Sequence, residues 1–312
     1  MDDSMVLVLL ATYNGQNYIR QMVDSVLAQD YENIRIVLSD DGSKDDTVSI
    51  LKEYAEKEPQ RVIHYQSGQR FGCAQKHFMH LMRTFHDAPY IMFCDQDDVW
   101  HPDKITKTLQ IMKQTELDSD APALVHTDLC VVDRELAQIA PSFCAHSNLD
   151  GNRLKMNQLL VQNVVTGCTM MVNRPLAELA CRKFSEDAML MHDWWLAILA
   201  SAFGQTGFLA EATIDYRQHG NNSVGAKNVR SVKYLITRLR TKKMRKSLMD
   251  GAKQAQAFLA CYEDLLNPEQ IELLKAFSST QNASIFVRDF VYIKYKLLKY
   301  GFVRVMAQLL GW

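Results

Sequence analysis

The stretch YIMFCDQDDVW, residues 90–100, joins a five-residue apolar run to three carboxylates within four positions. Such a run, preceded by Pro89 and followed by acids, is typical of a buried strand in a parallel sheet. Open α/β sheets bind their ligands at the carboxyl ends of the strands. Asp95 and Asp97 are two positions apart, so both can point toward one ligand. We therefore expect a binding site where this strand ends.

The chemistry of that site follows from its carboxylates. Two carboxylates this close repel each other unless a cation lies between them. Carboxylate oxygens suit Mg²⁺ or Mn²⁺, so Asp95 and Asp97 predict a metal site. The alternative is an acidic surface loop in which Asp98 caps the next helix. The metal site is favoured because nothing structural requires three acids after a buried strand.

Strands and helices alternate around this stretch. Apolar runs predict strands at 5–11, 34–38 and 62–65, and helical spacing predicts helices after each of them. Pro102 fits the first position of a further helix. This alternation predicts an α/β fold with a doubly wound, mostly parallel sheet and flanking helices. Neither G-x-G-x-x-G after the first strand nor G-x-x-x-x-G-K-[ST] occurs, which disfavours a dinucleotide-binding Rossmann domain and a P-loop.

The second half is less regular. Strands are expected at 123–132, 169–172 and 208–216, and a helix at 192–202. A polar loop follows at 217–223. From residue 228 onward only helical patterns occur, so a helical C-terminal region is expected.

Composition places the chain among soluble globular proteins. Of its 312 residues, 47% are hydrophobic and 23% are charged. The seven cysteines form no C-x-x-C pair, which favours reduced thiols in the cytoplasm over a disulfide framework or a zinc site. No signal peptide and no run of eighteen apolar residues is apparent, so a membrane span is not expected.

The charge is unevenly distributed. Residues 226–312 carry 16 basic and 6 acidic side chains, whereas the net charge of the whole chain is −1. Nine basic and no acidic residues lie between Lys227 and Lys246. We expect this region, 227–312, to contact the anionic inner face of the cell membrane. The alternative is a solvated basic face, and no nucleic-acid-binding motif accompanies the charge.

Four motifs in order resemble the family 2 glycosyltransferases. They are A-T-Y-N-G at 11–15, S-D-D-G-S-K-D at 39–45, F-C-D-Q-D-D-V-W-H-P-D-K at 93–104 and H-D-W-W at 192–195. The resemblance covers about residues 5–225 and implies a GT-A fold and inverting, metal-dependent sugar transfer. It divides the chain into a glycosyltransferase domain, 1–225, with a nucleotide-sugar half (about 1–115) and an acceptor half (about 116–225), and a basic helical region, 226–312. The D-Q-D-D-x-W form and Y-R-Q-H-G-N-N at 216–222 look most like bacterial rhamnosyltransferases.

The resemblance also implies roles for individual residues at the donor site. Thr12, Tyr13 and Asp41 match positions that hold the base and ribose of the donor nucleotide. Asp95 and Asp97 match the D-x-D motif, whose aspartates hold ribose and metal, with Asp97 as the direct metal ligand. For Asp41 an alternative is a structural role in a turn, since Asp before Gly is common there.

The resemblance also concerns Asp193, Lys76 and His219. Asp193 matches the catalytic base, and its alternative is a helix N-cap. Lys76 is a candidate for binding the donor phosphates, although the family often has Arg-Asn or Lys-Asn where this chain has Lys76-His77. His219 either reaches the metal or diphosphate from its loop or is simply solvated.

The implied partners are a dTDP- or UDP-linked sugar donor, Mn²⁺ or Mg²⁺, and a saccharide or lipid-linked saccharide acceptor. Two other interpretations stay open at this point. Residues 95–99 also fit the D-x-D-x-[TV] motif of haloacid-dehalogenase phosphatases, with Asp95 as nucleophile and Asp97 as general acid. That motif should follow the first strand, and here it follows the fourth. The third interpretation is a non-catalytic nucleotide-sugar-binding subunit.

Overall fold

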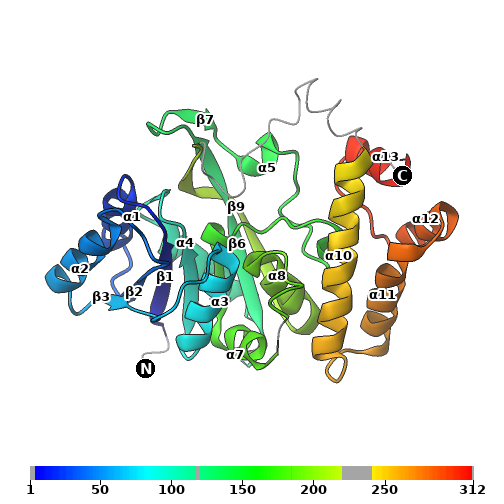
Figure 1. The fold of residues 1–312 in the computed structure, drawn as a ribbon, viewed down its shortest axis with the longest axis horizontal. Helices are drawn as coiled ribbons and strands as arrows, with labels where there is room; N and C mark the ends of the chain where they lie inside the picture. Colours follow the sequence, from blue (N-terminus) through cyan, green and yellow to red (C-terminus); the bar gives the residue numbers. More distant parts are fainter. Residues whose placement is uncertain (1–3, 117, 119, 184, 220–240, 311–312) are drawn as a thin grey trace.

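The computed structural model describes residues 4–116, 118, 120–183, 185–219 and 241–310. In this part of the chain one mixed β-sheet forms the centre, helices cover both of its faces, and a group of C-terminal helices lies at one end (Figure 1). The predicted α/β fold with flanking helices and a helical C-terminal region is confirmed. The predicted domain boundary at residue 225 lies outside the described residues.

The sheet runs in the order β3-β2-β1-β4-β8-β6-β9-β5, and β7 pairs with β6. The strands are β1 (Val6–Thr12), β2 (Ile34–Asp40), β3 (Val62–Tyr65), β4 (Tyr90–Cys94), β5 (Val99–Trp100), β6 (Ala123–Val132), β7 (Gln138–Ala140), β8 (Met170–Asn173) and β9 (Gln205–Arg217). The first four pair in parallel. Antiparallel β8 then joins β4 to β6, and β9 runs parallel to β6.

The register of the parallel strands brings their carboxyl ends together. Thr12 at the end of β1 pairs with Asp40 at the end of β2, and Leu10 pairs with Cys94 at the end of β4. The residues that follow these strands therefore meet at one edge of the sheet, with central β1 between its two neighbours. Asp95 directly follows Cys94 at this edge.

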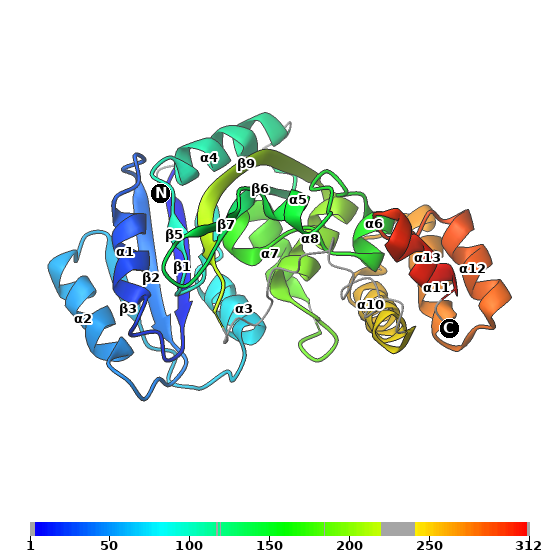
Figure 2. The same ribbon diagram turned by 90° about the horizontal axis from the view of Figure 1, so that it is seen from above.

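The described helices either pack around the sheet or form the C-terminal group. They are α1 (Ile19–Leu27), α2 (Thr47–Lys57), α3 (Ala74–Thr84), α4 (Lys104–Thr115), α5 (Phe143–His146), α6 (Met156–Val161), α7 (Arg174–Arg182), α8 (His192–Phe203), α10 (Thr241–Tyr262), α11 (Pro268–Ser279), α12 (Ile285–Lys294) and α13 (Phe302–Leu310), with 3₁₀ turns at Gly167–Thr169 and Thr280–Asn282. Apolar residues of α1, α2 and α4 pack with one set of strand residues. Those of α3, α7 and α8 pack with the alternate set, so each strand contributes to two cores. Figure 2 shows these layers from above.

Some local expectations differ from the structure. Pro102 is not the first residue of a helix, because α4 begins at Lys104 after a turn. Asp98 does not cap α4: its side chain is 1% exposed and accepts the backbone N–H of Arg217 at 3.0 Å. Helix α7 was not expected from the sequence, although it has a strong start signal. The Asn173 side chain caps it, and a proline occupies its first turn.

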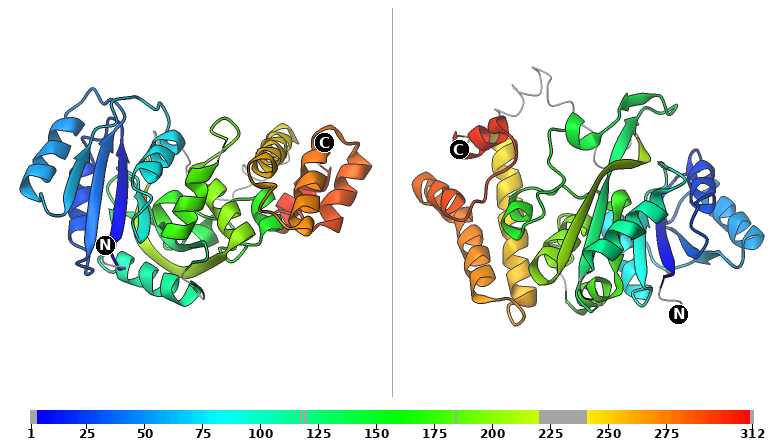
Figure 3. Two further views of the ribbon diagram at one scale, coloured as in Figure 1. Left: turned by 90° about the horizontal axis from the view of Figure 1, so that it is seen from below. Right: turned by 180° about the vertical axis from the view of Figure 1, so that it is seen from behind.

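The C-terminal helices share a core with helix α8 of the central part of the chain. The Trp195 ring of α8 is fully buried and packs edge-on against the Phe258 ring of α10, with ring centroids 5.3 Å apart. The Tyr262 ring lies beside both. Figure 3 shows α10 between the green helices of the centre and the orange helices α11 and α12. The described part of the C-terminal region is therefore attached by an apolar interface.

Hydrogen bonds add a second attachment between residues 295–304, which run from the end of α12 into α13, and residues 147–162. The Lys299 ammonium donates to the carbonyl oxygen of Val161 at 2.5 Å. The Arg304 guanidinium donates to two carbonyl oxygens of the facing segment, each at 2.6 Å. We call this contact the C-terminal seam. Among the described helices, none is both long and apolar enough to cross a membrane.

Candidate active site

A cleft of about 1280 Å³ opens at the carboxyl edge of the parallel strands. Its lining includes the loops after β1, β2 and β4 and the segments 162–167 and 191–194. Residues of α10 and of the C-terminal seam also contribute. Single ligand pockets usually measure 300–1,000 Å³. The cleft therefore has room for more than one small ligand.

The loop after β1 is fixed by a side chain from the loop after β4. The Gln96 amide accepts the Tyr13 N–H at 2.8 Å and donates to the Tyr13 carbonyl at 3.1 Å. A Cβ on Gly15 would lie 2.4 Å from the Gln96 oxygen, so a larger residue there would displace the Gln96 side chain from Tyr13. Thr12 and Tyr13 both line the cleft, and the Arg70 guanidinium donates to the Tyr13 hydroxyl at 3.0 Å. Arg70 thus brings a cation to this end of the cleft, a contribution that the sequence did not indicate.

Asp41 lines the cleft from the turn after β2 and is 6% exposed. Its carboxylate accepts the backbone N–H groups of Phe71 at 2.5 Å and Gly72 at 2.8 Å. In this structure Asp41 therefore holds the loop that carries Arg70. The neighbouring Asp40 closes its own turn by accepting the N–H groups of Gly42 and Ser43.

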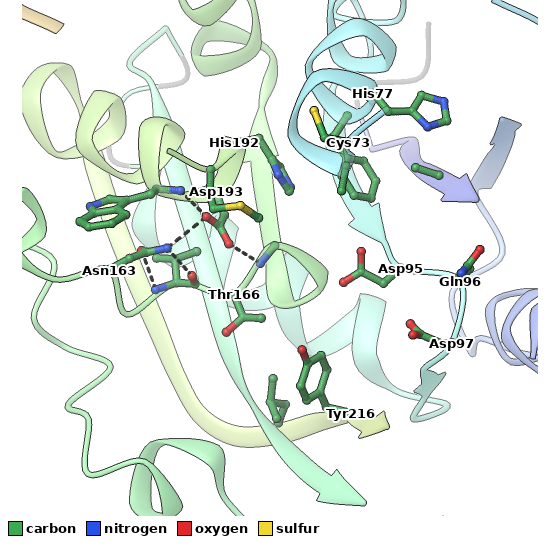
Figure 4. Close-up of a pocket in the computed structure, with 18 of the residues that line it drawn as sticks. Cys73, His77, Asp95, Gln96, Asp97, Asn163, Thr166, His192, Asp193 and Tyr216 are labelled. Atoms are coloured by element: carbon green, nitrogen blue, oxygen red, sulfur yellow. Dashed lines mark hydrogen bonds between the residues drawn. The ribbon is translucent and has the colours of Figure 1, made fainter. Parts of the chain in front are cut away.

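The carboxylates after β4 separate into two directions. Asp95 and Asp97 line the cleft (Figure 4). Asp98 is instead buried and accepts the N–H of Arg217 in β9. Because β4 ends at Cys94, the strand alternation invoked for Asp95 and Asp97 does not apply, and a turn directs them instead. Burial, followed by the charges of Asp97 and Asp193, raises the pKa of Asp95. The site therefore concentrates negative charge, which a cation would relieve.

Two groupings of metal-binding atoms exist here. Ligand atoms of Asp95, Asp98 and Cys168 lie within 4.8 Å of one another. Asp97 Oδ2, however, lies 2.6 Å from His219 Nε2, and both residues line the cleft. Asp98 is turned away from the cleft and already accepts a backbone N–H, whereas Asp95, Asp97 and His219 all line the cleft.

Arg217, the last residue of β9, holds this corner together. Its guanidinium donates to the Asp97 carbonyl at 2.7 Å and to the Gln21 side chain at 2.7 Å. The Tyr18 ring lies against the Arg217 guanidinium at 4.8 Å and stacks on the His219 ring at 5.3 Å. His219 is thus packed against Asp97 and Tyr18, and it is not a solvated loop side chain. Residues 220–223 of the predicted loop lie outside the described residues.

Asp193 faces Asp95 across the cleft (Figure 4). It lies inside the first turn of α8, whose N-cap residue is Met191. Its Oδ2 accepts the Gly167 N–H at 3.0 Å, and its Oδ1 accepts from the Asn163 amide at 3.1 Å and from the Trp194 N–H at 2.5 Å. Burial is the largest influence, and it raises the pKa of Asp193 to about 7 despite these donors. A carboxylate with this pKa is suited to accept a proton near neutral pH.

The structure places the neighbours Lys76 and His77 in different surroundings. Lys76 does not line the cleft, and its ammonium lies 4.0 Å from the Glu186 carboxylate on the surface. His77 does line it, and its ring stacks on Phe71 with a centroid distance of 4.7 Å. Of the two tryptophans after Asp193, Trp194 lines the cleft and Trp195 lies in the core.

Comparison with known proteins agrees with this geometry. The model of the family described as "Glycosyl transferase family 2" matches residues 7–179. The chain belongs to glycosyl transferase family 2. The protein is therefore a glycosyltransferase, which decides against the phosphatase and non-catalytic interpretations.

Three known proteins illustrate the relationship. This family 2 glycosyltransferase is 28% identical to the dTDP-rhamnosyl transferase RfbG of Shigella flexneri over 236 residues, which cover 72% of this chain and 76% of that protein. The structure of S. aureus TarS 1–349 in complex with UDP-GlcNAc is similar with a TM-score of 0.58 and 14% identity, covering 89% of this chain and 72% of that one. The mannosyltransferase PcManGT of Pyrobaculum calidifontis, in complex with GDP-Man and Mn²⁺, gives a TM-score of 0.51 at 18% identity and covers 98% and 85%. The two structural likenesses establish the GT-A fold.

Proposed function

We propose that this family 2 glycosyltransferase is an inverting, metal-dependent enzyme. It transfers a sugar from a nucleotide diphosphate donor to a hydroxyl group of a saccharide. The single observation that carries this proposal is the position of Asp193, a buried carboxylate that faces Asp95 across one continuous cleft. Donor and acceptor sites on opposite walls allow a direct displacement, which inverts the anomeric centre and needs no enzyme nucleophile.

The donor nucleotide occupies the wall formed by the loops after β1, β2 and β4. Thr12, Tyr13 and Asp41 contact its base and ribose, with Asp41 exchanging its bonds to the 71–72 loop for the ligand. Arg70 is better placed than Lys76 to contact the donor phosphates, because it lines the cleft. The donor is a dTDP- or UDP-linked sugar, and similarity to RfbG makes dTDP-rhamnose the first to test.

Asp95, Asp97 and His219 would hold a divalent cation, Mn²⁺ or Mg²⁺. The donor set fits, since two carboxylates and an imidazole suit Mn²⁺. Burial, followed by the charges of Asp97 and Asp193, raises the pKa of Asp95, and a cation would offset that negative charge. When bound, the ion neutralises charge on the departing diphosphate. The contacts of Arg217 and Tyr18 hold the Asp97 backbone and the His219 ring in place for this role.

Asp193 is the general base. Its Oδ atoms accept the proton of the attacking acceptor hydroxyl, while the N–H of Gly167 and the Asn163 amide keep the carboxylate oriented. A Cβ on Gly167 would lie 2.8 Å from the His192 ring, so glycine allows this backbone to approach. A positioned base contributes typically 10²–10⁴-fold.

The acceptor enters between the 162–167 segment, Trp194 and the C-terminal seam. It is a glycan or lipid-linked saccharide used in cell-surface polysaccharide assembly, which would locate the enzyme in the cytoplasm and at the inner face of the membrane. The basic segment between Lys227 and Lys246 lies largely outside the described residues, and its membrane contact stays a prediction.

A direct test is a screen of nucleotide sugars, dTDP-rhamnose first, for metal-dependent binding and for transfer to saccharide acceptors. Asp193→Asn serves as the matched control, because it should bind the donor and fail to transfer. Donor-dependent product formation equal in the variant and the wild type would contradict the assignment of the base.

A further inference from the structure

Helix α12 has two faces of opposite environment. Arg288, Val291 and Tyr292 are buried against the neighbouring elements. Phe286, Phe290 and Ile293, at the i, i+4 and i+7 positions of a single helical stripe, are 84%, 65% and 61% exposed. A phenylalanine this exposed on a regular helix is not explained by packing among the described residues.

The exposed apolar side chains are concentrated here. Seven of the eleven large apolar side chains that are exposed in the described part of the chain lie between residues 285 and 303. They are Ile285, Phe286, Val287, Phe290, Ile293, Phe302 and Val303. We call them the α12–α13 apolar surface. Single exposed apolar residues are ordinary, but a concentration of this kind marks a surface that another body covers.

The charge around these residues favours an anionic body. Residues 285–309 contain five basic side chains and one acidic side chain, Asp289. Asp289 is already paired with Arg288 at 2.8 Å. Lys294 and Lys296 are exposed at the end of α12, and Lys294 also lies 3.4 Å from the Glu272 carboxylate. Aromatic and aliphatic side chains next to lysines are typical of helices that lie in the interface of an anionic lipid bilayer.

The same segment leads into the active-site cleft. Lys299 and Arg304 line the cleft, while Phe302 and Val303 between them are exposed. Figures 1 and 2 place α12 and α13 together at the end of the molecule remote from β1–β3. A bilayer against this end would therefore adjoin the part of the cleft opposite the donor wall, from which a lipid-linked acceptor could reach Asp193.

We propose that the α12–α13 apolar surface docks on an anionic lipid bilayer and places the acceptor end of the cleft at the membrane. This deepens the proposed function and rests on it for the identity of the acceptor. Helix α12 has ten residues and lies parallel to the bilayer surface, with Phe286, Phe290 and Ile293 inserted below the headgroups.

The test is cosedimentation of the full chain with vesicles of phosphatidylcholine alone and with phosphatidylglycerol added. The wild type should bind the anionic vesicles more tightly and lose binding at high salt. The variant F286S/F290S should bind at least about tenfold more weakly for each phenylalanine removed, because each loses the burial of a large apolar side chain. Ile139→Ser, which removes a side chain 52% exposed on β7, should bind like the wild type. Equal melting temperatures will show that these surface variants fold.

Three results would overturn the proposal. They are wild-type protein that ignores both kinds of vesicle, F286S/F290S that binds like the wild type, and a wild-type dimer that this variant converts to monomers in light scattering. The last result would identify a second copy of the chain as the covering body. Vesicle binding requires no catalysis, so Asp193→Asn should bind vesicles normally. Failure of docking is thereby separated from failure of the proposed transfer reaction.

Discussion

Asp193 should impose an acid limb on the reaction, and the position of that limb should depend on Asn163. With a pKa of about 7, the base is about half ionised at pH 7 and only about a tenth ionised at pH 6. The value of kcat/KM should therefore rise about tenfold per pH unit below 7 and level off above about pH 8. The raised pKa also means that the folded state holds this proton more tightly than the unfolded chain. The free energy of unfolding should accordingly fall as the pH rises from about 4 to about 7.

Removing the Asn163 amide should shift the midpoint of this acid limb to higher pH. The amide donates to Asp193 Oδ1 at 3.1 Å and stabilises the ionised form. A hydrogen bond to a charged group contributes about 1.5–3 kcal/mol, and water would replace part of it. We expect Asn163→Ala to raise the midpoint by about one pH unit, so that kcat/KM falls about fivefold at pH 7 and little at pH 9. Asn163→Asp, which keeps an acceptor for the Val165 N–H but adds a negative charge, should raise it further.

The assay is sugar transfer between pH 5.5 and 9, with donor and Mn²⁺ binding measured by calorimetry at the same pH values. The binding data separate the titration of Asp193 from any loss of metal at Asp95. If both Asn163 variants keep the wild-type midpoint, or if Asp193→Asn retains the limb, the reasoning about the base is refuted.

Three further outcomes are expected. Asp97→Ala, or a chelator added to the wild type, should sharply weaken nucleotide diphosphate binding in calorimetry, and equal affinity with and without Mn²⁺ would contradict the metal site. Asp193→Asn should keep its circular dichroism spectrum and donor affinity while transfer falls by about 10²-fold or more, and near-normal turnover would reassign the side chain to the helix end. Phe258→Ala should cost about 3–5 kcal/mol in urea unfolding, since the ring is fully buried against Trp195, and a loss below about 1 kcal/mol would show that the interface of α8 and α10 contributes little.

The first half of the fold could be predicted because its signals are local. Each strand before Asp95 is a short apolar run followed by a helix with regular apolar spacing, and β1, β2, β3 and β4 lie within a few residues of the expected ranges. The position of Asp95 at the carboxyl edge follows from that alternation alone. The antiparallel insertion of β8 between β4 and β6 could not be predicted in this way, because strand pairing across long separations leaves little local pattern.

The candidate site shows the same contrast between residues with local sequence signals and residues without them. Thr12, Asp41, Asp95 and Asp97 belong to strand ends, and the structure brings them to one cleft. Asn163 gave no signal, since it lies in a loop of mixed polarity and becomes meaningful only when α8 places Asp193 beside it.

Lys76 and Arg217 show the two ways in which residue patterns mislead. The resemblance to the family predicts that Lys76 contacts the donor phosphates, yet its helix directs it to the surface near Glu186. The sequence predicts Arg217 in a polar loop, but its guanidinium joins the Asp97 carbonyl, 120 positions away, and the Gln21 side chain, 196 positions away. Contacts of that separation depend on the completed sheet.

The C-terminal seam makes the proposed acceptor wall a product of two distant parts of the chain. Across the seam, residues 147–162 form hydrogen bonds with residues 295–304. The residues that follow 162, up to Gly167, form hydrogen bonds with Asp193. A chimera that imports the last hundred residues of a relative while keeping its own 147–162 segment would join mismatched halves of one surface. Exchanges meant to change the acceptor should therefore carry both pieces together, because inheritance of either piece alone would disturb the base before it altered specificity.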